Sequence, residues 1–260
     1  MRLYLLPKSF NGQASLEIKG KDYVYLTKVL RLKEKQIITG RDREGRLWDL
    51  CIEKIGKDFC LLSAKSAETA QARTDALPQT GPEKTIILYQ CLPKGRKTDD
   101  IIKKATEAGV RDIVLVKSRN CVADLEGKEA SRLDRYDAMV TEAIQQSGSM
   151  VPTKVSGVID IKDIPEDFEQ RVSQENRLGL VLHQSSIPGQ NNDLVQCLKN
   201  FDGAVAIVVG PEGGLEENEC QTLIERSFKA VLLKTNILRC ETASIYAIGA
   251  VQTILESSCR

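Results

Sequence analysis

Six consecutive apolar residues, 204–209, limit the fold of this chain more than any other feature. An uninterrupted apolar run of this length is typical of a strand buried on both faces, as at the centre of a parallel sheet. The chain then turns through Gly210-Pro211-Glu212-Gly213-Gly214 and continues as an amphipathic stretch to Phe228, which predicts a helix. A strand, a glycine-rich turn and a helix N-terminus together bring backbone N–H groups close to a ligand.

The acidic residues around this turn indicate the charge of the ligand. Glu212, Glu216, Glu217 and Glu219 cluster there, and the Lys-Ser or Lys-Thr pair that a phosphate loop requires does not follow. Four carboxylates would repel a polyphosphate and favour a cationic or zwitterionic ligand, such as S-adenosylmethionine. From the turn alone, an ordinary strand-to-helix connection with an acidic first helical turn fits equally well.

From residue 85 onward, strand-like and helix-like patterns alternate. The sequence predicts strands near 86–92, 113–116, 155–159, 178–182, 204–209 and 230–233, and helices near 98–108, 132–146 and 242–256. This alternation predicts an α/β domain with a mostly parallel sheet.

The first section of the chain has a different pattern. Short strands are predicted at 3–6, 36–41, 46–55 and 59–67, with a short helix over 23–30 and a hairpin turn at 42–45, which favours a small β-barrel or curled sheet. Residues 71–84 lack apolar periodicity and contain two prolines, as linkers do. We therefore expect a β-barrel domain over 1–72, a linker over 73–84 and an α/β domain over 85–260.

The composition of the chain indicates where the protein is located and whether it can hold a metal ion. No apolar run reaches membrane-spanning length and the start of the chain lacks a signal-peptide core, so we expect a cytoplasmic protein with no membrane contact. The eight cysteines include no Cys-x-x-Cys pair and His183 is the single histidine, which is poor material for a metal site. We expect reduced, mostly buried cysteines, although Cys240 beside Arg239 and Glu241 is an alternative candidate nucleophile.

A second constellation follows the last predicted strand. Leu238-Arg239-Cys240-Glu241-Thr242-Ala243 leads into the final helix, where Thr242 or Cys240 would lie near the N-cap and Glu241 at the positive end of the helix dipole. A simple surface ion pair between Arg239 and Glu241 is the alternative.

These two segments carry a family resemblance. Gly210-Pro211-Glu212-Gly213-Gly214, Glu219 and Ile237-Leu238-Arg239-x-Glu241-Thr242-Ala243 resemble the signature of the ribosomal RNA small subunit methyltransferase E family, of the SPOUT superfamily. Further similar motifs lie at 29–33, 94–95, 104–110 and 142–147. The resemblance implies S-adenosylmethionine-dependent methylation of N3 of a uridine in 16S ribosomal RNA. It also implies a PUA-like β-barrel, an α/β domain with a carboxyl-terminal trefoil knot, and a homodimer that acts on 16S RNA or the small ribosomal subunit.

The resemblance also assigns roles to residues. It places Gly210, Glu212, Gly213 and Gly214 in a first cofactor loop, and Leu233, Ile237 and Leu238 in a second. We add Leu182 and His183, because they lie at the end of a strand where α/β sheets bind ligands, and Thr242 at the start of the last helix. For His183 a purely structural role is the alternative.

The chemistry of the reaction suggests roles for the charged pair. Methylation of uracil N3 develops negative charge on the base, so we expect Arg239 to stabilise this anion or to position a phosphate, and Glu241 to orient Arg239 or accept the proton. A net charge of +5 over residues 1–75 makes basic side chains candidates for RNA phosphates. The principal candidates are Arg31, Lys33, Arg41, Arg43, Lys94 and Arg96, with Lys35, Arg46 and Lys97 as further ones. For each of them, a solvated basic side chain is the alternative.

Two segments depart from the family pattern. Lys234-Thr235-Asn236 replaces the usual Gly-Pro-Arg, and 145–149 lacks a carboxylate and an arginine of the usual middle-helix motif. These departures keep open a catalytically weak or inactive RNA-binding or ribosome-assembly protein on the same scaffold. A nucleotide-dependent small-molecule enzyme is disfavoured by the missing phosphate-loop lysine and the carboxylates at the glycine turn.

Overall fold

The structure, a computed structural model, describes residues 3–7, 9–42, 45–66, 85–122, 129–172, 176–184 and 192–258. The chain divides into two compact units: Met1–Thr80 with Ile144–Pro152, and Gly81–Ala143 with Thr153–Arg260. Each unit is described by itself. The expected linker at 73–84 lies outside the described residues, so the expected domain boundaries stay a prediction.

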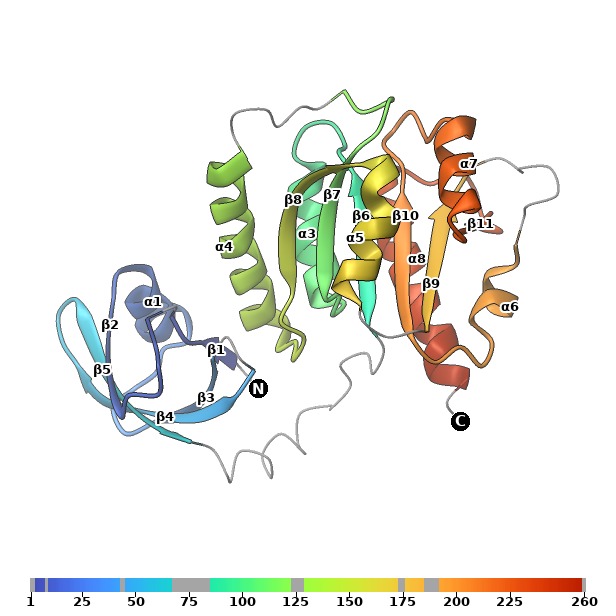
Figure 1. The fold of residues 1–260 in the computed structure, drawn as a ribbon. Helices are drawn as coiled ribbons and strands as arrows, with labels where there is room; N and C mark the ends of the chain where they lie inside the picture. Colours follow the sequence, from blue (N-terminus) through green and yellow to red (C-terminus); the bar gives the residue numbers. More distant parts are fainter. Residues whose placement is uncertain are drawn as a thin grey trace. The chain divides into compact units, whose positions relative to one another are not determined.

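The first unit is built on one five-stranded sheet, which curls around a short helix (Figure 1). The strand order is β1-β3-β4-β5-β2, and β1 pairs with β3 in parallel while the other pairs are antiparallel. The bounds are β1 Leu3–Leu5, β2 Ser15–Lys19, β3 Ile37–Arg41, β4 Leu47–Ile55 and β5 Phe59–Ser66. Leu26, Leu50, Ile52 and Leu62 are fully buried and form its core.

Two details of this unit differ from the sequence expectations. Strand β2 was not expected, because only Leu16 and Ile18 of its five residues are apolar; they point inward and the polar residues between them outward. The single helix expected over 23–30 is instead α1, Gly20–Val24, which continues into a π-helical turn, Tyr25–Val29. In that turn Leu26 is buried in the core.

The second unit contains a six-stranded sheet in which every pair of described strands is parallel. The order is β11-β9-β10-β6-β7-β8. The bounds are β6 Ile86–Cys91, β7 Asp112–Lys117, β8 Lys154–Asp160, β9 Arg177–Leu182, β10 Ala204–Val209 and β11 Lys229–Val231. The mostly parallel sheet predicted from the alternation of patterns is therefore confirmed.

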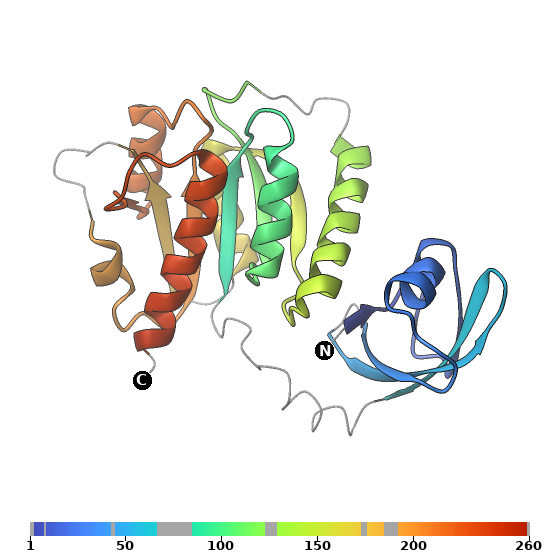
Figure 2. The same cartoon turned by 180° about the vertical axis from the view of Figure 1, so that it is seen from behind.

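Helices cover both faces of this sheet. Helices α3 (Lys97–Glu107) and α8 (Cys240–Ser258) lie on one face (Figure 2), and α5 (Ile164–Arg171) and α7 (Glu217–Glu225) on the other (Figure 1). The remaining elements are α4 (Glu129–Ser147), α6 (Leu194–Leu198) and the 3₁₀ turn Ile161–Asp163. Alternate strand residues such as Tyr89 and Val208 belong to one hydrophobic cluster with Phe168 of α5 and Leu223 of α7. Two-sided burial explains why β10 consists entirely of apolar residues.

No helix in the described part of the chain is both long and apolar enough to span a bilayer.

Candidate functional site

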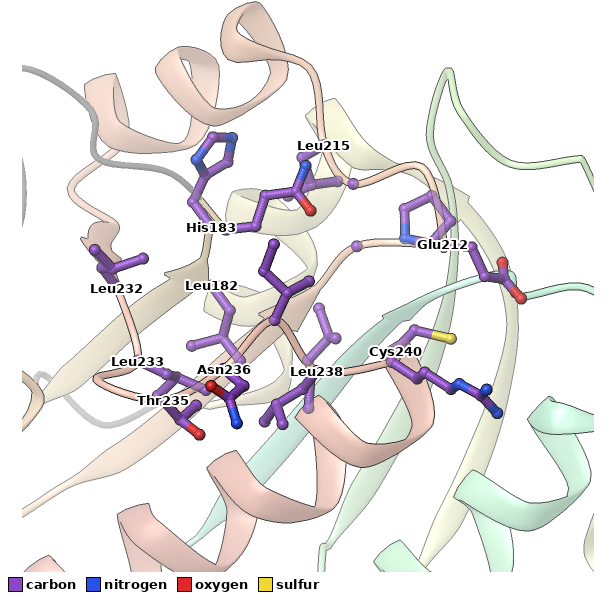
Figure 3. Close-up of a pocket in the computed structure, with 18 residues that line it drawn as sticks. Leu182, His183, Glu212, Leu215, Leu232, Leu233, Thr235, Asn236, Leu238 and Cys240 are labelled. Atoms are coloured by element: carbon purple, nitrogen blue, oxygen red, sulfur yellow. The ribbon is translucent and has the colours of Figure 1, made fainter.

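A cavity of about 300 Å³ lies at the carboxyl ends of three neighbouring strands, β9, β10 and β11. Such strand ends are where open α/β sheets bind ligands. The lining residues come from the ends of β9 and β10, from the connections that follow the three strands, and from the first turn of α8 (Figure 3). They are Leu182, His183, Gln184, Val209, Gly210, Pro211, Glu212, Gly214, Leu215, Leu232, Leu233, Thr235, Asn236, Ile237, Leu238, Arg239, Cys240 and Ala243.

The glycine turn after β10 has a shape that larger residues would disturb. A side chain at Gly210 would place its Cβ 3.1 Å from the backbone nitrogen of Leu215, and Gly214 has a φ of +72°, which favours glycine. From the connection after β7, Asn120 Nδ2 donates to the carbonyls of Gly213 and Gly214, at 3.4 and 3.2 Å. The turn is therefore held both by its own backbone and by a neighbouring loop.

Of the four carboxylates at this turn, the structure places only Glu212 in the cavity lining. Glu219 instead accepts the backbone N–H of Glu216 at 2.9 Å, as part of a capping box at the start of α7. It also accepts the backbone N–H of Arg119, whose guanidinium lies 3.3 Å from Glu216. The expectation that four carboxylates together set the charge of the cavity is therefore wrong, because helix capping occupies two of them.

Lys97, the first residue of α3, joins the glycine turn to the last helix. Its Nζ lies 2.7 Å from Glu212 Oε1 and 3.5 Å from Glu241 Oε2. Burial raises the pKa of Glu212, but hydrogen bonds from Lys97 and from backbone N–H groups outweigh burial, so the net pKa is lowered. The pKa of Glu241 is lowered in the same way, with contributions from the Cys240 thiol and Lys97.

Arg239 and Glu241 do not form the expected pair. Among the described residues, the Arg239 side chain has no hydrogen-bond or ion-pair partner, and it is exposed at the cavity. Helix α8 begins at Cys240, and Ala243 N–H donates to the Arg239 carbonyl at 2.8 Å. Arg239 is therefore the N-cap, and Cys240 and Thr242 lie near it, in the first turn of the helix. Residues two apart at a helix start point in different directions, which separates the two side chains.

Cys240 is not suited to nucleophilic chemistry. Burial and the neighbouring Glu241 raise the pKa of its thiol to about 12, and the thiol donates to Glu241 Oε2 at 3.2 Å. A protonated, buried thiol is a poor nucleophile, which argues against the alternative raised from the sequence.

The connection after β11 combines apolar side chains with polar ones. Ile237 is 82% exposed although it is apolar, and it borders the cavity. Lys234 Nζ forms an ion pair with Asp193 at 2.7 Å, and Asp193 also caps α6. An exposed apolar side chain beside a cavity is available to cover a ligand.

Most of the expected cofactor contacts meet in this cavity. Its lining includes Leu182, His183, Gly210, Glu212, Gly214, Leu233, Ile237 and Leu238, whereas Gly213 and Thr242 lie outside it. The residues of the lining that were not expected are Gln184, Val209, Pro211, Leu215, Leu232, Thr235, Asn236 and Ala243. Gln184, Val209, Pro211 and Leu232 lie at or just after a strand end, and that position was the signal that would have found them.

The basic candidates have different surroundings. Arg31 and Lys33 are exposed in the first unit, and Lys94 and Arg96 are exposed before α3. Arg41 is buried, and its Nη1 donates to the carbonyl of Ser149 at 2.9 Å, so its side chain does not reach solvent as expected. Arg43 lies outside the described residues. Within those residues, no group of three or more His, Cys, Asp or Glu side chains is arranged to hold a metal ion.

Comparison with known proteins gives consistent results along the chain. Residues 80–252 match the model of an RNA methyltransferase domain and residues 18–65 that of an RNA methyltransferase PUA domain. The ribosomal RNA small subunit methyltransferase E 2 of Borreliella burgdorferi is 28% identical over 241 residues, 91% of this chain and 90% of that protein. The small subunit methyltransferase E of Aquifex aeolicus is 31% identical over 171 residues, 65% of this chain and 68% of that protein.

A solved structure shares this fold over nearly the whole length. It is the ribosomal RNA small subunit methyltransferase E of Neisseria gonorrhoeae bound to S-adenosyl methionine. It matches with a TM-score of 0.79 and 26% identity, over 98% of both chains.

Proposed function

Because the chain belongs to the ribosomal RNA small subunit methyltransferase E family, we propose that it transfers a methyl group from S-adenosylmethionine to small-subunit ribosomal RNA. The finer proposal is that the acceptor is N3 of a uridine in 16S RNA. The observation that carries the proposal is a cavity at three parallel strand ends, with Arg239 at its edge, whose side chain has no ion-pair partner in the described ranges.

The residues of the cavity fit this cofactor. The volume of about 300 Å³ is at the lower end of the range for small-molecule sites. Leu182, Leu233 and Leu238 offer apolar surface for the adenine, and Ile237 would cover it. When bound, the cofactor supplies a methyl group on a sulfonium, an electrophile that needs no activation by metal. In Figure 3, Glu212 and Cys240 lie on the side of the cavity opposite Leu232 and Thr235.

Arg239 provides the chemistry at the acceptor base. Uracil N3 must release its proton to solvent water, and negative charge then spreads onto N3 and the two carbonyl oxygens. A guanidinium already placed at the cavity stabilises that charge without reorganisation. Glu241 does not line the cavity, so we assign it a positioning role rather than the role of proton acceptor.

Arg31 and Lys33 in the first unit, and Lys94 and Arg96 in the second, are the side chains that we propose to contact RNA phosphates. All four are exposed and basic. Action on ribosomal RNA also supports a cytoplasmic location.

The trefoil knot and the homodimer are further proposals. The described order of β9, β10 and β11 supports the knot, because β11 lies beyond β9 while β10 lies on its other side. The surface of α8 supports the dimer: Tyr246 is 49% exposed, and a Cβ at Gly249 would meet no atom within 4 Å, so another backbone could approach closely.

The test compares the wild-type protein with Arg239→Ala. Wild type should bind S-adenosylmethionine in calorimetry and transfer tritium from it to small subunits or their RNA, and mass spectrometry of the RNA should locate a methylated uridine. Arg239→Ala should lower kcat by roughly 10²–10³-fold, the cost of removing one anion-stabilising donor. Its cofactor affinity should be unchanged.

Arg226→Ala is the matched control, since Arg226 pairs with Glu166 on the surface and does not line the cavity. Normal turnover by Arg239→Ala would refute its role. Cofactor binding without transfer to any form of the RNA would favour the RNA-binding, catalytically inactive alternative.

A further inference from the structure

Lys97 brings together three segments that are distant in the sequence. It begins α3, whereas Glu212 belongs to the glycine turn and Glu241 to the first turn of α8. The two carboxylates are 29 residues apart along the chain. One ammonium group therefore contacts both the loop after β10 and the helix that follows Arg239.

The surroundings hold Lys97 in this position. The N-cap residue of α3, Arg96, makes no side-chain capping bond. Glu212 accepts the backbone N–H of Lys94, two residues before that N-cap, at 3.1 Å as well as the Lys97 ammonium. Glu212 therefore contacts both the segment that leads into α3 and the first residue of the helix.

The bridge is partly shielded from water. The side chains of Lys97, Glu212 and Glu241 are 33%, 29% and 19% exposed. Without the ammonium, two carboxylates would stand close together beside the cavity and repel each other. The hydrogen bond that Lys97 donates to Glu212 also raises the pKa of Lys97, which keeps the ammonium charged.

We propose that Lys97 is a positioning residue of the methyltransferase: its ammonium fixes the 210–214 loop to the start of α8, and so fixes the cofactor loop relative to Arg239. This inference rests on the proposed function. It assigns Lys97 a role different from the RNA phosphate contact considered from the sequence. A phosphate approaching Lys97 would meet two carboxylates that already engage the ammonium, which disfavours that contact.

The experiment compares Lys97→Met and Lys97→Arg with Lys104→Met. Lys104 lies in the same helix and pairs with the exposed Asp100 at 2.7 Å, so its loss controls for removal of a charge from α3. Lys97→Met should weaken S-adenosylmethionine binding roughly tenfold and lower kcat, while the KM for RNA stays near wild type. Lys97→Arg should restore most of the cofactor affinity and most of kcat. Lys104→Met should match wild type in both.

A double-mutant cycle with Glu241→Gln tests the bridge directly. If Lys97 acts through Glu241, Lys97→Met should have a smaller effect on cofactor affinity and kcat in the Glu241→Gln background than in wild type. Strictly multiplicative effects of the two substitutions would overturn the proposal. So would a raised KM for RNA, with a weaker salt dependence of RNA binding and unchanged cofactor affinity, because that pattern identifies a phosphate contact.

Cofactor affinity is measured without RNA, so failure of the proposed function can be distinguished from failure of the proposal for Lys97. A wild-type protein that binds S-adenosylmethionine but never methylates RNA would refute the proposed function and leave the affinity arm of this test intact. Circular dichroism and thermal unfolding of Lys97→Met report its folding, and the cycle in the Glu241→Gln background remains decisive even if that variant is less stable.

Discussion

At the scale of single residues, two cysteines near the cofactor loop illustrate how surroundings determine reactivity. Cys240 is a protonated thiol with a pKa of about 12. The pKa of Cys121 is lowered to about 6, first because the Cys91 thiol donates to it and also because Ser118 does. Ser118 Oγ lies 3.2 Å from the Cys121 sulfur. The thiol of Cys121 is therefore acidic, whereas the thiol of Cys240 stays protonated and unreactive at neutral pH.

This contrast predicts the pattern of alkylation. Iodoacetamide at pH 7 should modify Cys121 well before Cys240, since the thiolate is the reactive form. Labelling of Cys121 should slow as the pH falls through about 6, because protonation removes the thiolate. Peptide mass spectrometry over a pH series measures both rates, and Cys121→Ser is the control. Faster labelling of Cys240 would contradict these pKa values.

The family resemblance, rather than any local pattern, named Gly210, Gly214, Leu233 and Leu238 as residues of the two cofactor loops. All four line the cavity, and their contact with a cofactor stays a prediction. The pairing of Arg239 with Glu241 failed, because it depended on where α8 begins. The role of Lys97 was not predictable, because its partners lie 115 and 144 residues away.

At the scale of elements, a polar network links β6, β7 and α5 within the second unit. The Tyr89 hydroxyl donates to Asp167 at 2.8 Å, and Arg171 binds Asp167 through two nitrogens at 2.6 and 3.1 Å. Arg171 also contacts Asp112 at the start of β7. Because Tyr89 is fully buried, its hydroxyl needs this carboxylate, and burial with the nearby Asp167 raises the pKa of the phenol.

Asp167→Asn should therefore destabilise the protein. The substitution keeps the side-chain volume but removes the negative charge of the carboxylate, which pairs with Arg171 and accepts the hydrogen bond from Tyr89. We expect the free energy of unfolding to fall by about 2 kcal/mol. Urea unfolding measures this change. Glu166→Gln on the same helix is the control: Glu166 pairs with Arg226 in an exposed position, so we expect a loss below about 1 kcal/mol. Equal effects of the two substitutions would contradict the importance of the network.

The sequence predicted the strands and helices of the second unit better than their arrangement. Apolar runs such as Ala204–Val209 require two-sided burial, and the structure has every predicted strand of this unit. The order β11-β9-β10-β6-β7-β8 depends on which strands pair across long connections, and a local pattern carries no information about that pairing. Strand β2 was missed because two apolar residues are too few to show alternation.

At the scale of the whole molecule, helix α4 begins in one unit and ends in the other. Residues 129–143 belong to the second unit, whereas Ile144–Pro152 belongs to the first. The bond from Arg41 to the Ser149 carbonyl lies within the first unit and fixes this segment there. Immediately afterwards, the Thr153 hydroxyl donates to the Val110 carbonyl at 2.6 Å, back in the second unit.

This arrangement predicts the behaviour of a fragment containing residues 81–260. Its segment 144–152 would lack its packing partners, so amide hydrogen exchange there should be faster than in the full-length protein. Exchange in α3, whose contacts are within the second unit, should be nearly unchanged and serves as the internal control. Equal protection of 144–152 in the fragment and the full-length protein would contradict the assignment of this segment to the first unit.

Two separate segments of the chain form the first unit, and this has an evolutionary consequence. A recombination event in the 67–84 region would exchange only the amino-terminal part of the first unit and would leave nine residues of it behind in α4 and the following turn. An amino-terminal part acquired in this way would have to pack against those nine residues. We therefore expect the first unit and the second unit to be inherited together, and their sequences to diverge together.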